Sequence, residues 1–146
     1  IFICSFGKTY LTCRLIEGQF PDYRKVIPEE GTTRFTAKIS DALSAVDRVS
    51  LILREGDYNV VRIKVESEQL VIASRNLDVG DSVESVAAAV EGDEMELGFN
   101  VRYLMDILKH IDGESFKGST NGPLTPLLIK PEQEAGYLYI VTPVRK

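Results

Sequence analysis

The first residues along the chain that could do chemistry are those of a possible phosphate loop. Gly7-Lys8-Thr9 matches the last three positions of a phosphate-binding P-loop. The complete motif needs another glycine five residues before Gly7, where this chain has Phe2, and a helix should follow it. A strand pattern follows instead, so we interpret Gly7-Lys8-Thr9 as a hairpin turn.

Acid–base and nucleophilic catalysis would need other residues. His110 is the only histidine, and no Gly-x-Ser-x-Gly elbow supplies a nucleophile for it. Near the end of a helix, His110 fits a surface residue that complements the helix dipole. The acidic pairs Glu66/Glu68 and Glu94/Glu96 stand at strand or turn spacing, which is typical of solvated edges. We therefore expect no catalytic residue and no enzyme.

Metal and disulfide sites have little support. Asp93, Glu94 and Glu96 lack the spacing of an EF-hand. Cys4 and Cys13 are too far apart for a Cys-x-x-Cys site and too few for a disulfide scaffold. They fit a reducing compartment, with burial in strands as the plain expectation. We expect no metal and no cofactor.

Composition sets the broad class. The chain has 146 residues, a net charge of −5 and 44% hydrophobic residues, which suits one packed domain with a piece of a neighbour. No apolar run approaches the roughly 18 residues of a membrane helix. The net acidity argues against gripping nucleic acid by bulk charge, although it leaves room for a local basic surface.

Hydrophobic periodicity gives the elements of the first half. Ile1–Phe6 and Tyr10–Ile16 read as a hairpin. A helix is predicted over about Arg34–Val49, with Thr32 or Thr33 as its cap. Its apolar positions recur at three- and four-residue spacing, at Phe35, Ile39, Ala42, Leu43 and Val46.

The rest of the chain alternates between strands and one further helix. Strands are predicted over 61–65, 70–74, 83–90 and 95–99, then over 115–118, 124–130 and 137–141. Asn100 is expected to cap the second helix and Gly113 to end it. Its buried stripe is Val101, Leu104, Met105, Leu108 and Ile111. This order predicts an α+β fold with two helices packed on antiparallel sheets, and the two halves look like one unit used twice.

Four stretches carry a family resemblance. The segment at 15–28, LIEGQFPDYRKVIP, strongly resembles the connection between the second and third domains of the bacterial sliding clamps, the beta subunits of DNA polymerase III. Three further stretches keep that family's order and spacing, namely MELGFNVRYL at 95–104, PLLI at 126–129 and YIVTPVR at 139–145. The resemblance covers nearly the whole chain.

The resemblance implies a DNA-clamp fold and a domain division. Residues 1–22 would be the last strands of the middle clamp domain with its connector, and residues 23–146 the third domain. Because Ile1–Cys4 already reads as a strand, we expect a C-terminal fragment whose partner elements lie upstream.

The family's function follows as an expectation. Its members are non-catalytic processivity factors that form a head-to-tail homodimeric ring around duplex DNA, independently of sequence. They tether DNA polymerase III, the clamp loader and other proteins that carry a clamp-binding motif. A cytoplasmic protein without a membrane partner is expected.

The resemblance also assigns residues. The partner-peptide pocket beside the C-terminus would be lined by Pro21, Lys25, Val26, Leu124, Pro126, Ile140, Thr142, Pro143, Val144 and Arg145. The cations on the two inner helices, which would face DNA, are Arg34, Lys38, Arg48, Arg102 and Lys109. Ile52 and Leu53, at the end of the first helix, would make the ring-dimer interface.

Ordinary packing and other functions remain open. Core burial would explain Val26, Leu124 and Ile140 equally well, but it suits Pro143 less because the chain ends nearby. The tail also carries Thr142 and Val144 where many family members have methionines, and Lys146 where they have a final leucine, so peptide preference is expected to differ. The alternatives are a peptide-binding module without a DNA role, which would show no positive helix face, and a small-molecule enzyme, which would need a deep pocket with clustered carboxylates.

Overall fold

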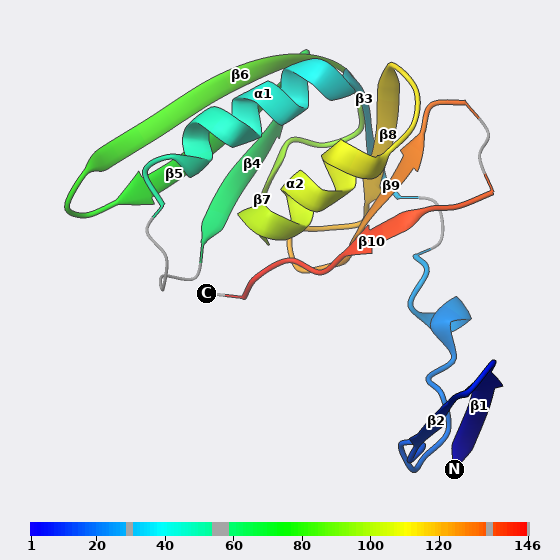
Figure 1. Cartoon of the computed structure of the whole chain (residues 1–146). Coiled ribbons are helices and arrows are strands. Elements are labelled where there is room, and N and C mark those ends of the chain that lie inside the picture. Colours follow the sequence, from blue (N-terminus) through cyan, green and yellow to red (C-terminus); the bar gives the residue numbers. More distant parts are fainter. Residues whose placement is uncertain (29–30, 54–58, 134–135, 146) are drawn as a thin grey trace.

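The computed structural model describes residues 1–28, 31–53, 59–133 and 136–145. It begins with a two-stranded antiparallel hairpin of β1 (Phe2–Phe6) and β2 (Thr9–Cys13), drawn in dark blue in Figure 1. Gly7 opens the turn with a φ of 59°, a conformation in which glycine has no Cβ penalty. The predicted hairpin and its turn are confirmed. Both cysteines are exposed, so their expected burial is wrong.

A short connection follows the hairpin. The 3₁₀ helix η1 (Tyr23–Lys25) is capped by Asp22, whose carboxylate accepts a hydrogen bond of 3.2 Å from the amide of Arg24. Every residue from 1 to 26 is exposed. This segment therefore depends on local hydrogen bonds for its shape.

The main body is an eight-stranded sheet in which all described pairings are antiparallel. Along the sheet the order is β10-β9-β8-β3-β6-β5-β4-β7. The strands are β3 (Thr33–Lys38), β4 (Val60–Glu66), β5 (Gln69–Asn76), β6 (Gly80–Glu91), β7 (Met95–Asn100), β8 (Ser115–Thr120), β9 (Leu127–Pro131) and β10 (Tyr139–Val141).

Two strand–helix–three-strand units interlock in this sheet. The helices are α1 (Ile39–Ser50), which follows β3, and α2 (Val101–His110), which follows β7. The first strand of each unit pairs with a strand of the other unit, β3 with β8 and β7 with β4. Neither unit can complete its sheet alone, so residues 33–141 form one cooperative body.

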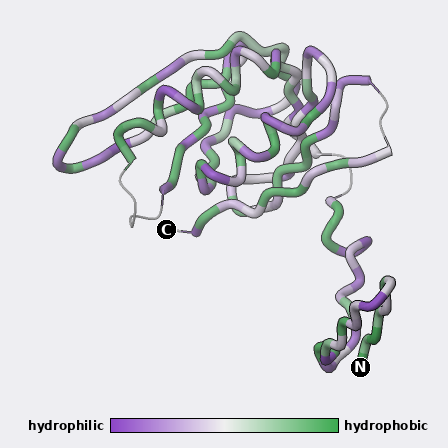
Figure 2. The backbone as a smooth tube through the Cα atoms, in the orientation of Figure 1, coloured by the Kyte–Doolittle hydropathy of each residue, from purple (hydrophilic) through white to green (hydrophobic). Residues whose placement is uncertain are grey.

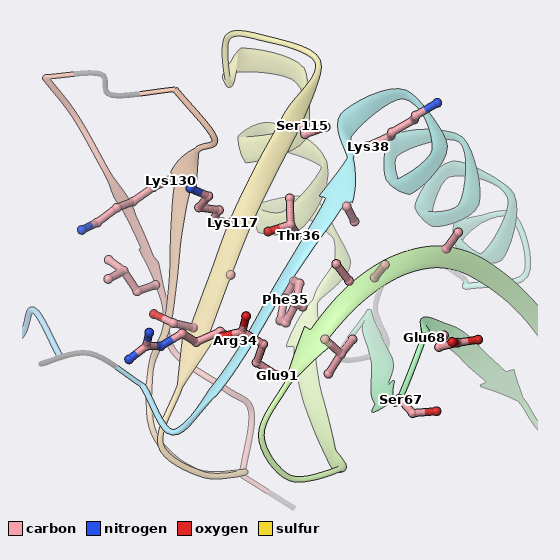
Figure 3. A pocket seen from close by; sticks show the side chains of 18 of the residues that line it. Arg34, Phe35, Thr36, Lys38, Ser67, Glu68, Glu91, Ser115, Lys117 and Lys130 are labelled. Carbon is pink, nitrogen blue, oxygen red and sulfur yellow. The ribbon is translucent and has the colours of Figure 1, made fainter.

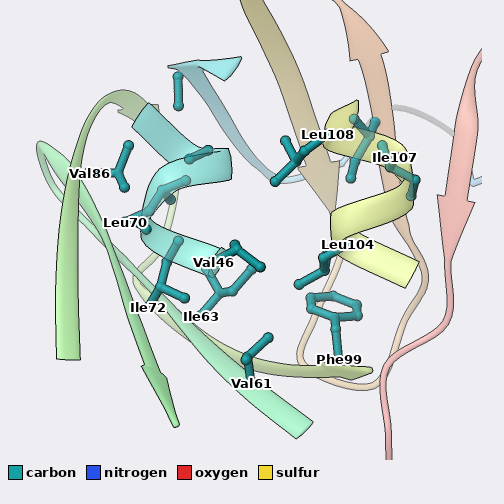
Figure 4. Packing of buried hydrophobic residues seen from close by; sticks show 14 of the residues in the cluster. Val46, Val61, Ile63, Leu70, Ile72, Val86, Phe99, Leu104, Ile107 and Leu108 are labelled. Atoms are coloured by element: carbon teal, nitrogen blue, oxygen red, sulfur yellow. The ribbon is translucent and has the colours of Figure 1, made fainter. Parts of the chain in front are cut away.

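Both helices pack on the same face of the sheet (Figure 1). Along the tube in Figure 2, hydrophobic and hydrophilic positions alternate in the helices and strands of the body. The hydrophobic positions meet in one core between helices and sheet (Figure 4). Val46, Phe99 and Leu104 are among its buried members, with Phe99 fully inaccessible to solvent. This burial is the main source of stability.

The prediction of a helix over Arg34–Val49 is wrong in its first part. Residues 33–38 form β3, and the helix begins only at Ile39. Every second residue of this strand is buried, namely Thr33, Phe35 and Ala37. The four-residue spacing from Phe35 to Ile39 also fits a helix, and it hid this period of two in the sequence. The helix N-cap is Lys38, which makes no side-chain cap hydrogen bond, so the threonine cap is wrong too.

The later elements mostly agree with the sequence pattern, although the strand predicted over 124–130 begins only at Leu127 and α2 ends at His110, before Gly113. Asn100 caps α2 by accepting a hydrogen bond of 2.9 Å from the amide of Arg102. The helix buries Val101, Leu104 and Leu108 as expected, together with Ile107 in place of the half-buried Met105. No helix in the described ranges is long and apolar enough to cross a membrane.

Candidate functional site

A cavity of about 460 Å³ lies between α2 and the end of the chain. Its lining residues are Tyr103, Asp106, Ile107, His110, Tyr139, Ile140, Val141 and Thr142. Hydrogen bonds hold the two walls together, because Tyr139 donates from its hydroxyl to the carbonyl of His110 at 3.3 Å. The site thus combines one helix face with the last strand and the residue after it.

The C-terminal tail crosses from β10 to β7. The amide of Val144 donates a hydrogen bond of 2.8 Å to the carbonyl of Gly98 on β7. Pro143 is buried, whereas Thr142 and Arg145 are exposed on either side of it. The argument that Pro143 suits burial least is therefore wrong, because this backbone hydrogen bond ties the tail to the body.

The structure brings together only part of the expected pocket. Ile140 and Thr142 line the cavity, and Pro143, Val144 and Arg145 continue from it along the tail. On the connection between β8 and β9, Leu124 is 60% exposed and Pro126 is half-buried.

The connector residues stand apart from this cavity. Pro21, Lys25 and Val26 are exposed, and Val26 shows 51% of its surface, so core burial does not explain it. Lys25 forms its described ion pair locally, with Asp22 at 3.9 Å. None of the three residues lines the cavity beside the tail.

Sequence reasoning missed the helix wall of the cavity. Tyr103, Ile107 and His110 stand at i, i+4 and i+7, so they share one side of α2. Tyr103 is 62% exposed, which is unusual for an aromatic side chain beside a buried stripe. The available signal in the sequence is the position of Tyr103, an aromatic residue that lies outside the buried stripe of the predicted helix.

Two of the five predicted helix cations lie elsewhere. Arg34 and Lys38 belong to β3 and alternate with the buried Phe35 and Ala37, so they occupy the sheet face opposite the helices. Figure 3 shows both residues at a second cavity, of about 1080 Å³, on that face. Their placement on an inner helix is wrong.

Arg48 lies on α1 but is paired. Its guanidinium donates to both carboxylate oxygens of Glu84 on β6, at 2.9 and 2.8 Å. This hydrogen bond lowers the pKa of Glu84; desolvation opposes the shift, and the charge of Arg48 adds to it. Much of the Arg48 charge is therefore compensated within the chain.

Arg102 and Lys109 are exposed on α2, seven residues apart and hence on one side of the helix. Acidic residues share the exposed helix surfaces, with Asp41 and Asp47 on α1 and Asp106 on α2. The helix face of the body is mixed in charge.

Ile52 and Leu53 follow α1 and are both half-buried. Leu53 packs against the core, and the carbonyl of Ile52 accepts a hydrogen bond of 2.8 Å from the side chain of Asn76. The residue before them, Leu51, is 78% exposed and was not predicted. The exposed apolar surface at this helix end is thus contributed chiefly by Leu51.

Comparisons with known proteins agree on one family. The family model of the DNA polymerase III beta subunit, C-terminal domain, matches residues 24–145. A beta sliding clamp of Caulobacter vibrioides is 34% identical over 141 residues, which are 97% of this chain and 38% of that protein. A beta sliding clamp of Bacillus subtilis is 33% identical over 134 residues, which are 90% of this chain and 35% of that protein.

A solved structure gives the same answer. The sliding clamp of Bartonella birtlesii bound to griselimycin superposes with a TM-score of 0.86 at 33% identity, covering 99% of this chain and 38% of that one. The chain therefore spans little more than a third of the length of these relatives. Since the family match runs through the whole sheet and both helices, the chain belongs to the DNA polymerase III beta subunit family, in which it matches the C-terminal domain.

Proposed function

We propose that this chain is the C-terminal part of a sliding clamp, a non-catalytic processivity factor of DNA replication in the cytoplasm. The complete protein would encircle duplex DNA as a homodimeric ring and tether DNA polymerase III, the clamp loader and other proteins with clamp-binding motifs. The observation that carries this proposal is similarity to proteins named beta sliding clamps over 97% of the chain.

The domain division belongs to the proposal. Residues 1–22 would be the last strands and connector of the middle domain, and residues 23–146 the third domain. Two observations support this boundary: the family model begins at residue 24, and β1 has its strand pairing with β2 rather than with the large sheet.

We place the partner-peptide cleft at the cavity beside the tail. Ile140 and Thr142 are shared between this cavity and the expected pocket, and Tyr103 adds an exposed aromatic wall. A preformed, largely apolar groove binds an extended peptide at a low entropic cost. Pro21, Lys25 and Val26 would join it through the connector.

Binding of griselimycin, which the Bartonella clamp holds in its structure, tests this cleft. We expect saturable NMR shift changes at Tyr103, Ile140 and Thr142, with Kd up to about 1 mM because much of the whole protein is absent. Tyr103→Ala should weaken binding about tenfold, since aromatic anchors dominate such sites.

Tyr10→Ala is the matched control, because Tyr10 is 77% exposed on the distant hairpin. It should leave the affinity unchanged. Deleting residues 142–146 should abolish binding, with circular dichroism to show that the body remains folded. Equal losses for Tyr103→Ala and Tyr10→Ala, or no saturable change at all, would overturn the cleft assignment.

For the DNA-facing surface we propose Arg102 and Lys109, with Arg48 attenuated by Glu84. Arg34 and Lys38 are left out because they lie on the other sheet face. A ring that holds DNA topologically needs only loose, sequence-independent phosphate contacts, which suits a surface of mixed charge.

The mixed charge also favours a second candidate, a peptide-binding module without a DNA role. A titration with a short duplex at low salt separates the two. A sliding surface predicts weak shifts in fast exchange around Arg102 and Lys109, which fade as salt rises. An absence of these shifts, with griselimycin binding intact, would favour the module.

The ring contact would form around the end of α1. Leu51 is exposed beside the half-buried Ile52 and Leu53. Among the described residues, 80–87 of β6 pair with β5 alone, which leaves the other side of this part of the strand open. An open strand edge next to apolar side chains is suited to sheet continuation with another chain.

A further inference from the structure

The larger cavity lies on the sheet face that the helices do not cover. Its volume is about 1080 Å³, and β3, β6, β8 and β9 contribute to its lining, as Figure 3 shows. It shares no lining residue with the cavity beside the C-terminal tail. An inference about it is therefore independent of the proposed peptide cleft.

The strand register places two lysines side by side on this face. Lys117 of β8 lies directly opposite Lys130 of β9, and Thr36 of β3 is the other neighbour of Lys117. Directly opposed residues of antiparallel strands have Cβ atoms about 5 Å apart. Two positive charges therefore stand together in the cavity wall.

Neither lysine of this pair forms an ion pair within the described part of the chain. Lys117 and Lys130 are both exposed, and neither has an acidic partner among the described residues. Like charges placed directly opposite each other destabilise a sheet. The arrangement therefore costs stability in the free chain and would be relieved by an anionic group.

The surroundings suit carboxylates in particular. Ser119 lies two residues along β8, about 7 Å from Lys117, and adds a hydroxyl. Its cross-strand neighbour Arg34 donates from Nε to the carbonyl of Gly31 at 3.1 Å and lies opposite Glu91 of β6. The exposed Ala89 gives apolar surface beside the polar groups, whereas Leu128 is buried. Glu68 and Glu91, at the opposite rim, restrict the cationic part to the β8–β9 side.

We propose that this face docks an acidic, extended segment of a partner protein, with its carboxylates on Lys117 and Lys130. A protein segment fits better than single-stranded nucleic acid, because Phe35, the one aromatic residue of the described lining, is 3% exposed and offers no stacking surface. The chain's net charge of −5 repels polyanions at long range, so binding requires this local cluster.

The test uses the 146-residue chain and a fluorescein-labelled hexaglutamate peptide at low salt. Saturable anisotropy and NMR shifts centred on Lys117, Ser119 and Lys130 are expected. The double variant Lys117→Gln/Lys130→Gln should weaken binding at least about tenfold, because charge-assisted hydrogen bonds would be lost. The same variant should melt a few degrees higher than the parent, since the repulsion is gone.

Lys8→Gln/Arg14→Gln is the matched control, as it removes the same charge at two exposed positions outside the cavity lining. It should change the affinity less than about twofold. Equal losses for the two double variants would show bulk electrostatics and overturn the site. Tighter binding of an oligothymidine of equal charge would overturn the protein-segment assignment, and no saturable binding up to about 1 mM would overturn both.

Discussion

Apolar and polar residues alternate both in the hairpin of residues 1–13 and in the large sheet of residues 33–141, yet the two regions differ completely in the burial of their apolar side chains. Phe2, Ile3, Phe6 and Leu11 are between 48% and 88% exposed, whereas Phe99, of the same chemistry, is fully buried. Figure 2 shows hydrophobic positions in both regions. What separates them is a partner surface, since the hairpin has two strands and no helix over it.

The difference shows that strands can pair without forming a hydrophobic core. Alternation is sufficient to pair β1 with β2, but two strands alone bury little apolar area. The body adds two helices and an interlocked eight-stranded sheet. Exposed apolar side chains on the hairpin are expected if residues 1–22 belong to the middle domain, as proposed above.

The largest expected contrast comes from truncating one phenylalanine in each region. Phe99→Ala should lower the free energy of unfolding by about 3–5 kcal/mol, because it leaves a cavity in the core. Phe6→Ala should change it by less than about 0.5 kcal/mol. Urea unfolding followed by circular dichroism at 222 nm, which reports α1 and α2, measures both. A comparable loss for Phe6→Ala would show that the hairpin packs on the body.

A glycine in each region sharpens the comparison. A Cβ at Gly118 would overlap the ring of Phe35, so Gly118→Ala should cost about 1–3 kcal/mol through overpacking. Gly7→Ala meets no neighbour and strains only its own left-handed backbone. It should therefore loosen the hairpin, seen in its NMR shifts, and leave the urea midpoint of the body in place. A shifted midpoint for Gly7→Ala would contradict this independence.

The smallest contrast concerns pH. Because Arg48 lowers the pKa of Glu84 below its ordinary value of 4.5, the folded state binds fewer protons than the unfolded state there. The stabilisation is present above pH 4.5 and is lost as the pH falls through the lowered pKa.

Glu84→Gln should remove this dependence. The variant should melt lower than the parent at pH 7, and the two should converge as the pH falls through the lowered pKa of Glu84. Glu17→Gln, on the exposed connector, should follow the parent at every pH. If the melting temperatures of Glu84→Gln and the parent differed by the same amount at every pH, the ion pair would contribute nothing to the pH dependence of stability.

The sequence predicted most of the fold where one period ran undisturbed. Met95, Leu97 and Phe99 alternate cleanly, Asn100 stops the strand and caps α2, and the structure follows this residue by residue. Between Lys38 and Ile39 a strand is followed directly by a helix, with no glycine or proline to mark the boundary. The two periods merge there, so the helix was started five residues too early.

Because of that local error, two site residues were predicted on the wrong side of the sheet. Arg34 and Lys38 were assigned to an inner helix face but stand on the opposite face with Lys117 and Lys130. The helix wall of the tail cavity was missed for a related reason. Tyr103 and Ile140 are 37 positions apart, and only the packing of α2 beside β10 brings them to one cavity.

By itself the sequence determined most of the elements, with β3 as the exception, and it determined the α+β class and the family, because these depend on local period, capping and motif spacing. The tertiary structure alone decided which face each charge occupies, that Pro143 is buried, and that Lys117 meets Lys130. Strand order and register join residues that are distant in the chain. Alternation within a strand can indicate which side chains share a face, but no local pattern records which distant strands become neighbours.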